Sequence, residues 1–288
     1  MAHATHGTVF AVSDAAPLRL MEVHSSDLGA HAGALSEIFA GRLTGIVIRH
    51  AFQPEALKSV VEHLECADFG LQPQPATHFK GQTYGRVLIV GDRELGDYFR
   101  EGARFRAACR ALFADGSGFE ARIEELLRKV GGGRSVSVPR GPDGASYTPA
   151  TIRGLHAGGQ IDLHCENETV EFPSMWHLSG LLHARNQLSY YVMLALPQSG
   201  GELVIHNARH GEGAGQQLDR IERAGSAAIA ALAPYGELIP YTAVGDMIVF
   251  DSGRHFHRVT EVVGPRTRWT MGGFLARSLD DSALYYWS

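Results

Sequence analysis

The stretch IDLHCENE, residues 161–168, places His164 two positions before Glu166 in a run of alternating character. Side chains alternate between the two faces of a β-strand, so an extended run projects His164 and Glu166 to one side and Cys165 to the other. An imidazole and a carboxylate would then converge. Because a His-x-Glu pair also arises often by chance, a third ligand further along the chain decides whether this stretch belongs to a metal site.

The composition is that of a globular protein with a small-molecule ligand. The chain has 288 residues, of which 44% are hydrophobic and 20% charged, so it can bury a sizeable core. Acidic residues outnumber basic ones by 31 to 26, and the net charge of −5 comes without a run of Lys or Arg. This pattern argues against a nucleic-acid or anionic-membrane partner.

Neither disulfides nor an export signal are indicated. The three cysteines, Cys66, Cys109 and Cys165, are widely spaced and form no C-x-x-C pair. The N-terminus lacks a basic region followed by a long apolar run, and no stretch of 18 apolar residues occurs. We therefore expect a cytoplasmic protein that does not enter a membrane; the sequence does not indicate its oligomeric state.

The first part of the chain is expected to be rich in helices. Apolar residues recur at three- and four-residue spacing in residues 54–67 and 119–133, and residues 96–118 form a third helical candidate. A strand is expected within LTGIVIRH, residues 43–50.

After SVSVPRGPDGASYTP, residues 135–149, the texture changes to short β-branched and aromatic runs separated by Gly, Pro and Asp. Examples are LSYYVMLAL (188–196), GGELVIHN (200–207), GDMIVFDSG (245–253) and RWTMGGFLA (268–276). Their near-regular spacing predicts a mainly β fold with an antiparallel jelly-roll core and flanking N-terminal helices.

The chain is expected to form one domain over residues 1–288, with a helix-rich part at 1–135 and the jelly roll at 136–288. Residues 208–236 interrupt the strands. Long insertions between barrel strands are often lids, and we expect one here, with a helix at about 216–232.

A third ligand is available in GRHFHRV, residues 253–259, where His255 and His257 lie on one face. Arg268 follows His257 by eleven residues in an apolar strand. A His-x-carboxylate on an early strand, a distal His and an Arg at this distance form the layout of the iron(II)/2-oxoglutarate oxygenases. The chain resembles that superfamily, whose core is a double-stranded β-helix of the jelly-roll or cupin-like kind.

The chemistry explains these residue types. Two imidazoles and one carboxylate on one face of an octahedron leave three positions open, which suits iron(II) that must also bind 2-oxoglutarate and dioxygen. The resemblance implies that His164, Glu166 and His257 are the ligands. The guanidinium of Arg268 would hold the far carboxylate of 2-oxoglutarate.

Some alternatives stay open at this point. Glu168 and Asp162 share the face of Glu166 and could substitute for it. His255 has the same parity as His257, but the spacing to Arg268 favours His257. Arg266 is in phase with Arg268, but it is close to a turn and is expected to be solvent-exposed.

A closer resemblance covers most of the chain and is clear from about residue 138 onward. SYTPATIR (146–153), QLSYYVMLALPQSGGELVI (187–205), GGFLA (272–276) and YYWS (285–288) are similar to the carrier-independent halogenases of hapalindole and welwitindolinone biosynthesis, a branch of the same superfamily. This resemblance implies that Arg153 is a second contact to the cosubstrate. It also implies that Ser189 lies near the iron and donates a hydrogen bond there.

The sequence departs from these halogenases at Glu166. They have glycine at this position, and the vacancy lets chloride bind the iron. A carboxylate here would compete with halide, so we expect hydroxylation of an unactivated C–H bond of a freestanding small molecule, in secondary metabolism, with conversion of 2-oxoglutarate to succinate and carbon dioxide. The alternatives are an aliphatic halogenase and a cupin-like metal-binding module without redox chemistry.

Overall fold

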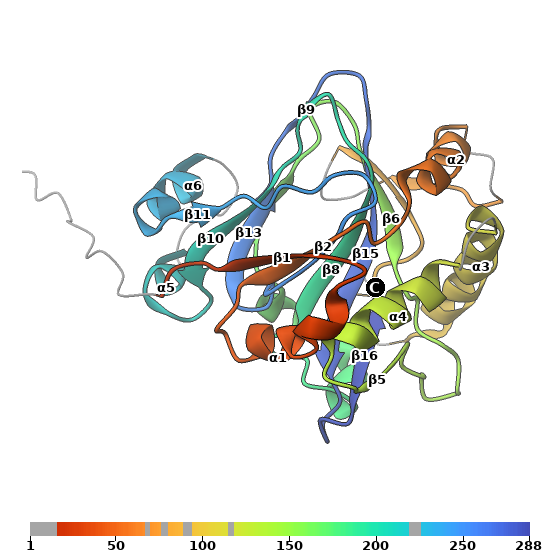
Figure 1. Cartoon of the computed structure of the whole chain (residues 1–288), viewed down its shortest axis with the longest axis horizontal. Helices are drawn as coiled ribbons and strands as arrows, with labels where there is room; N and C mark the ends of the chain where they lie inside the picture. Colours follow the sequence, from red (N-terminus) through yellow and green to blue (C-terminus); the bar gives the residue numbers. More distant parts are fainter. Residues whose placement is uncertain (1–15, 67–69, 76–79, 89–93, 115–117, 219–225) are drawn as a thin grey trace, which may run out of the picture.

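The structure is a computed structural model, and it describes residues 16–66, 70–75, 80–88, 94–114, 118–218 and 226–288. Two facing sheets form its centre, and the helices lie outside them (Figure 1). In the described part of the chain, no helix is both long and apolar enough to span a membrane.

The larger sheet has ten strands and runs through the middle of the molecule. Its main path is β1 (Leu20–His24), β2 (Gly45–Arg49), β12 (Met247–Phe250), β8 (Leu188–Ala195), β15 (Arg268–Arg277), β6 (Thr151–Leu155), β4 (Gly81–Tyr84) and β3 (Gln74–Pro75). Off this path, β16 (Ala283–Trp287) pairs with β15 and with β5 (Ser135–Ser137).

The smaller sheet carries part of the predicted site. Its order is β11 (Glu237–Leu238), β10 (Leu203–Arg209), β13 (His255–Val259) and β7 (Ile161–His164). A two-stranded ribbon of β9 (Ser199–Gly200) and β14 (Val262–Val263) lies beyond it. Two facing sheets with mostly antiparallel pairing form the double-stranded β-helix core, which confirms the predicted fold class.

The helices flank the sheets on opposite sides (Figure 1). The longer ones, which include all three predicted from periodicity, are α2 (Pro54–Glu65), α3 (Gly96–Leu112) and α4 (Phe119–Val130). The short ones are α1 (Ala34–Phe39), α5 (Gly213–Leu218), α6 (Ser226–Leu232) and the 3-10 turns η1 (Leu28–His31), η3 (Glu166–Thr169), η4 (Pro173–Met175), η5 (Leu178–Gly180) and η6 (Ala233–Tyr235).

Strand β8 separates two hydrophobic layers. Its residues alternate, so that Leu188, Tyr190 and Val192 pack into the main core, which the helices cover. Ser189 and Tyr191 point the other way, into the space between the two sheets. The larger apolar core therefore lies outside the barrel, and a smaller one, which includes Leu203 and Phe250, lies between the sheets beside the polar groups.

The segment predicted as a lid contains α5 and α6, and residues 219–225 lie outside the described residues. Ala228 and Leu232 of α6 pack with Leu163, Cys165 and Phe256 of the smaller sheet. The expected helix at about 216–232 therefore corresponds to two helices where the chain is described. That the segment acts as a lid stays a prediction.

Candidate metal and cosubstrate site

Two neighbouring strands of the smaller sheet bring the predicted histidines together. His164 ends β7, and His257 lies directly opposite it in β13. The centroids of the two rings are 4.2 Å apart. Residues opposite one another in an antiparallel pair point to the same face, so this register aims both imidazoles into the barrel.

The strand does not extend to Glu166 as the alternation predicted. It ends at His164, and Glu166 begins the 3-10 turn η3. The chain turns here because the Glu166 N–H donates to the Ser252 carbonyl at 3.0 Å, and the Thr169 hydroxyl donates to the Glu166 carbonyl at 2.8 Å. Cys165 keeps an extended backbone, so the side chain of Glu166 still turns to the side of His164.

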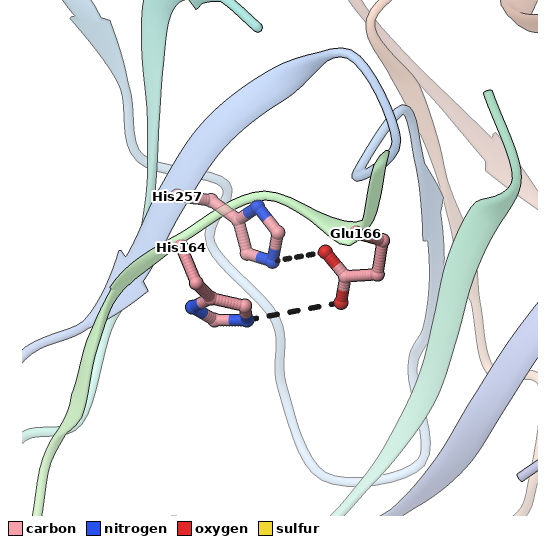
Figure 2. A group of neighbouring side chains, drawn as sticks. All are labelled: His164, Glu166 and His257. Atoms are coloured by element: carbon pink, nitrogen blue, oxygen red, sulfur yellow. Dashed lines mark ion pairs between the residues drawn. The ribbon is translucent and has the colours of Figure 1, made fainter. Parts of the chain in front are cut away.

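The carboxylate of Glu166 faces both imidazoles (Figure 2). Oε1 lies 3.7 Å from Nε2 of His164, and Oε2 lies 3.3 Å from Nε2 of His257. Among the residues described, these three form the one group of His, Cys, Asp or Glu side chains able to share a metal ion, and their ligand atoms lie within 4.8 Å of one another. Glu168 and Asp162, the open alternatives, are not in this group.

The hydrogen bonds of the two rings suit a metal ligand. Nδ1 of His164 donates to the Asp162 carbonyl at 2.7 Å, and Nδ1 of His257 donates to the His255 carbonyl at 3.0 Å. A carbonyl can only accept, so Nδ1 carries the proton, and in a neutral ring Nε2 offers its lone pair to the centre. Metal-ligating histidines are typically held in this way.

The surroundings of the Glu166 carboxylate also suit the binding of a cation. Oε2 of Glu166 is buried, and among the described residues it pairs with Nε2 of His257, 3.3 Å away. Only 6% of the residue is exposed. A buried carboxylate whose two oxygens each face an imidazole nitrogen fits a site for a divalent ion.

Electrostatics in the site favour a neutral His164 beside an anionic Glu166. Burial, with a contribution from His257, lowers the pKa of His164 to about 4. Burial alone would raise the pKa of Glu166, but attraction by His257 and His164 outweighs it and brings the pKa to about 2. Burial likewise opposes charge on His257, yet Glu166 raises its pKa overall. A metal ion would therefore replace one proton, the one on His257.

Two arginines on adjacent strands face the same cavity. Arg153 of β6 is opposite Thr270 of β15, and Arg268 lies two residues before Thr270, so all three share one face. Burial lowers the pKa of both guanidinium groups. The Arg268 guanidinium lies 5.3 Å from the centre of the Tyr191 ring. Neither arginine forms an ion pair with a carboxylate among the described residues.

The cavity between the sheets connects the histidines to the arginines. It encloses about 590 Å³, its open mouth included, and is lined by all six predicted site residues: Arg153, His164, Glu166, Ser189, His257 and Arg268. The side chain of His164 is 37% exposed, so the cavity opens on that side. Sequence reasoning missed Tyr191 and Thr270, although their alternation with Ser189 and Arg268 in the same strands would have placed them on this face.

The other residues weighed from the sequence lie away from the centre. His255 is buried, and its Nδ1 donates to the His206 carbonyl at 3.1 Å. His206 is a buried strand residue, and burial lowers its pKa to about 4. Arg266 is exposed, as predicted, and donates to the Pro197 carbonyl at 3.3 Å.

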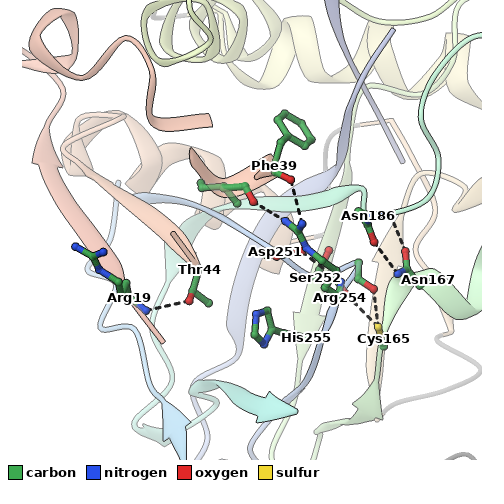
Figure 3. Close-up of polar contacts among 12 residues, drawn as sticks. Arg19, Phe39, Thr44, Cys165, Asn167, Asn186, Asp251, Ser252, Arg254 and His255 are labelled. Carbon is green, nitrogen blue, oxygen red and sulfur yellow. Dashed lines mark hydrogen bonds and ion pairs between the residues drawn. The ribbon is translucent and has the colours of Figure 1, made fainter. Parts of the chain in front are cut away.

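Polar contacts of Cys165, Asn167 and Arg254 join the segment around Cys165 to neighbouring loops (Figure 3). The thiol of Cys165 faces away from the centre and donates to the Gly253 carbonyl at 2.7 Å. Asn167 and Asn186 join the loop after Glu166 to the start of β8 through hydrogen bonds of 3.0 and 2.7 Å. Arg254 pairs with the buried Asp251 at 2.6 Å and so holds the turn before β13.

The fold and the site together define a double-stranded β-helix protein with a candidate two-histidine, one-carboxylate metal centre facing two arginines. The sequence profile of the carrier-protein-independent halogenase WelO5 family matches residues 17–288. The chain belongs to this family, within the iron(II)/2-oxoglutarate oxygenase superfamily.

Solved structures support the fold. An N-substituted L-amino acid dioxygenase from Burkholderia ambifaria AMMD is 18% identical, with a TM-score of 0.57 over 88% of this chain and 91% of that one. The same kind of enzyme in complex with alpha-KG is 19% identical, with a TM-score of 0.52 over 88% and 90%. No curated protein is significantly similar in sequence.

Proposed function

We propose that the protein is an iron(II)- and 2-oxoglutarate-dependent dioxygenase that hydroxylates an unactivated C–H bond of a freestanding small molecule. The observation that carries this proposal is the carboxylate of Glu166, which faces the Nε2 atoms of His164 and His257 from a buried position. Three such ligands leave three positions of an octahedral ion for the cosubstrate and dioxygen. When bound, the iron would supply the redox chemistry that activates dioxygen.

The arginines support 2-oxoglutarate as the cosubstrate. A dianion that enters the cavity would meet two guanidinium groups that have no carboxylate partner in the described chain. Arg268 would hold the far carboxylate, because a planar guanidinium fork matches carboxylate geometry. Arg153, which interacts electrostatically with Glu166, would contact the cosubstrate nearer the metal.

The remaining walls favour an apolar substrate. Ile161 and Phe274 line the cavity, and its charged side chains already have roles toward the metal and the cosubstrate. A substrate would therefore be held near the metal by apolar contact, as expected for C–H chemistry in secondary metabolism.

The proposal treats residues 1–288 as one oxygenase domain, because β1 to β4 of the N-terminal part join the larger sheet. It assigns the enzyme to the cytoplasm, where the three cysteines, all of them outside disulfides, would stay reduced.

Hydroxylation is preferred over halogenation because of Glu166. A halide would have to displace a carboxylate that the fold already holds beside both histidines, and that carboxylate has a high effective concentration. Halogenation is the second candidate, since the chain belongs to a family named for that activity.

The test begins with anaerobic addition of iron(II) and 2-oxoglutarate to the protein. A weak visible charge-transfer band is expected from the chelate, and in the Arg268→Met variant it should require about 100-fold more 2-oxoglutarate. Candidate metabolites are then screened for stimulated succinate formation, and products are analysed with and without saturating chloride. A chlorinated main product would establish halogenation instead, and binding of a ligand without succinate release would support a module without redox chemistry.

A further inference from the structure

The two oxygens of the Glu166 carboxylate have different surroundings. The hydroxyl of Ser189 donates to Oε1 at 3.3 Å, while Oε2 lies 3.3 Å from Nε2 of His257. Ser189 belongs to β8 of the larger sheet, whereas Glu166 follows β7 of the smaller one. This hydrogen bond therefore links the two sheets at the proposed metal centre.

The number of carboxylate oxygens bound to the metal decides whether the reaction is possible. With two imidazoles and one carboxylate oxygen, an octahedral ion keeps three positions, two for 2-oxoglutarate and one for dioxygen. If both oxygens bind, only two positions remain, so 2-oxoglutarate would leave none for dioxygen. A carboxylate in this position must therefore be kept to a single bond with the ion.

We propose that Ser189 is a positioning residue that restricts Glu166 to one metal-binding oxygen, Oε2. This inference rests on the proposed function. The hydroxyl occupies a lone pair of Oε1, which lies 3.7 Å from Nε2 of His164, and leaves Oε2, at 3.3 Å from Nε2 of His257, as the oxygen available to the metal. In family members with glycine at position 166, the hydroxyl would have no carboxylate to hold.

The local structure explains why this restraint acts on the side chain. The backbone of Glu166 is already fixed through its N–H and its carbonyl. Glutamate has one methylene more than aspartate, so its carboxylate can still rotate after the backbone is held. Ser189 is rigid by comparison, because β8 is paired on both sides, with Phe250 and with Phe274 opposite this residue.

The length of the hydrogen bond indicates what it does. At 3.3 Å it exceeds the usual distance of about 2.7 Å between a hydroxyl and an oxygen acceptor, so it contributes little to the stability of the fold. Its loss should change how the metal centre binds ligands and leave the thermal stability of the protein nearly unchanged.

The experiment compares Ser189→Ala, Ser189→Thr and wild type, with Ser174→Ala as the matched control. Ser174 is also buried, and its hydroxyl has no hydrogen-bond partner in the described chain. Each protein is titrated anaerobically with Co(II), followed by its visible spectrum, and the loaded protein is then titrated with 2-oxoglutarate. Melting temperatures are recorded in parallel.

We expect Ser189→Ala to bind Co(II) as tightly as wild type or more tightly, because the second oxygen can then join the ion. Binding of 2-oxoglutarate should weaken about fivefold, the equivalent of one hydrogen bond of about 1 kcal/mol. Ser189→Thr, which keeps the hydroxyl, should restore wild-type affinity, and Ser174→Ala should match wild type throughout.

Two outcomes would overturn the inference. One is unchanged 2-oxoglutarate affinity in Ser189→Ala. The other is an equal loss of affinity for Co(II) and 2-oxoglutarate together with a lower melting temperature, which would indicate a purely structural role. If wild type itself binds neither the metal nor 2-oxoglutarate, the proposed function fails and this inference with it.

Discussion

Replacing Arg268 by methionine is expected to weaken 2-oxoglutarate binding by about 100-fold without destabilising the free protein. Arg268 is 3% exposed, and its charge has no carboxylate partner in the described chain. Hydrogen bonds to charged groups contribute about 1.5–3 kcal/mol each, so loss of a two-pronged anchor costs about 3 kcal/mol after partial compensation, or about 100-fold in affinity. In the free protein, burial lowers the pKa of Arg268, because removing the charged guanidinium from water costs free energy. Methionine has no charge, so the variant does not carry this cost.

The assay measures 2-oxoglutarate affinity of the Co(II)-loaded protein by calorimetry, and the melting temperature of the metal-free protein. Arg266→Met is the matched control, because Arg266 is two residues away and exposed. A dissociation constant for Arg268→Met within about threefold of wild type would refute the anchor. A lower melting temperature than wild type would refute the argument that the unpaired charge is costly.

Three further predictions concern the metal centre. The Glu166→Gly variant should bind Co(II) more weakly than wild type. With saturating chloride or azide, it should transfer the halide or azide to the substrate. Products without halogen or azide under these conditions would mean that position 166 does not select the reaction. A divalent ion at about one hundred times its dissociation constant should raise the unfolding free energy by about 2.7 kcal/mol, a shift of roughly 5 °C that a chelator reverses and His164→Ala lacks. Cobalt affinity should rise about tenfold per pH unit below the raised pKa of His257 and level off above it, because one proton is displaced; a hundredfold slope would mean that His164, with a pKa of about 4, also competes.

The sequence was sufficient to predict the types and spacing of the site residues. It was insufficient to predict how strands far apart in the chain pair with one another. The alternation in β7 and β13 put His164 and His257 on inward faces, yet only the pairing of the two strands makes them opposite one another. Likewise, a strand was expected within residues 43–50, but nothing local indicated that it would lie beside β12. Long-range pairing depends on which apolar faces fit together, and a single local pattern does not contain that information.

The local backbone structure at Glu166 could not be predicted from the sequence either. Strand alternation placed its side chain correctly, although the strand ends at His164 and a 3-10 turn follows. The turn depends on a hydrogen bond to Ser252, a residue far along the chain, so local periodicity could not predict it. The contact from Ser189 to the carboxylate has the same origin, because it joins two sheets whose packing the sequence does not specify.

Backbone groups orient the two histidines. Each imidazole donates from Nδ1 to the carbonyl two residues before it, in β7 and in β13 alike, so the backbone of each strand fixes its own ring. Nothing in this arrangement depends on Glu166. A family member with glycine at position 166 could keep the same pair of rings and the same arginines, and offer the third position to a halide. The choice between hydroxylation and halogenation would then depend on the Glu166 carboxylate and on Ser189, which holds it. A substitution at position 166 therefore tests which reaction occurs. A substitution of either histidine would instead abolish metal binding altogether.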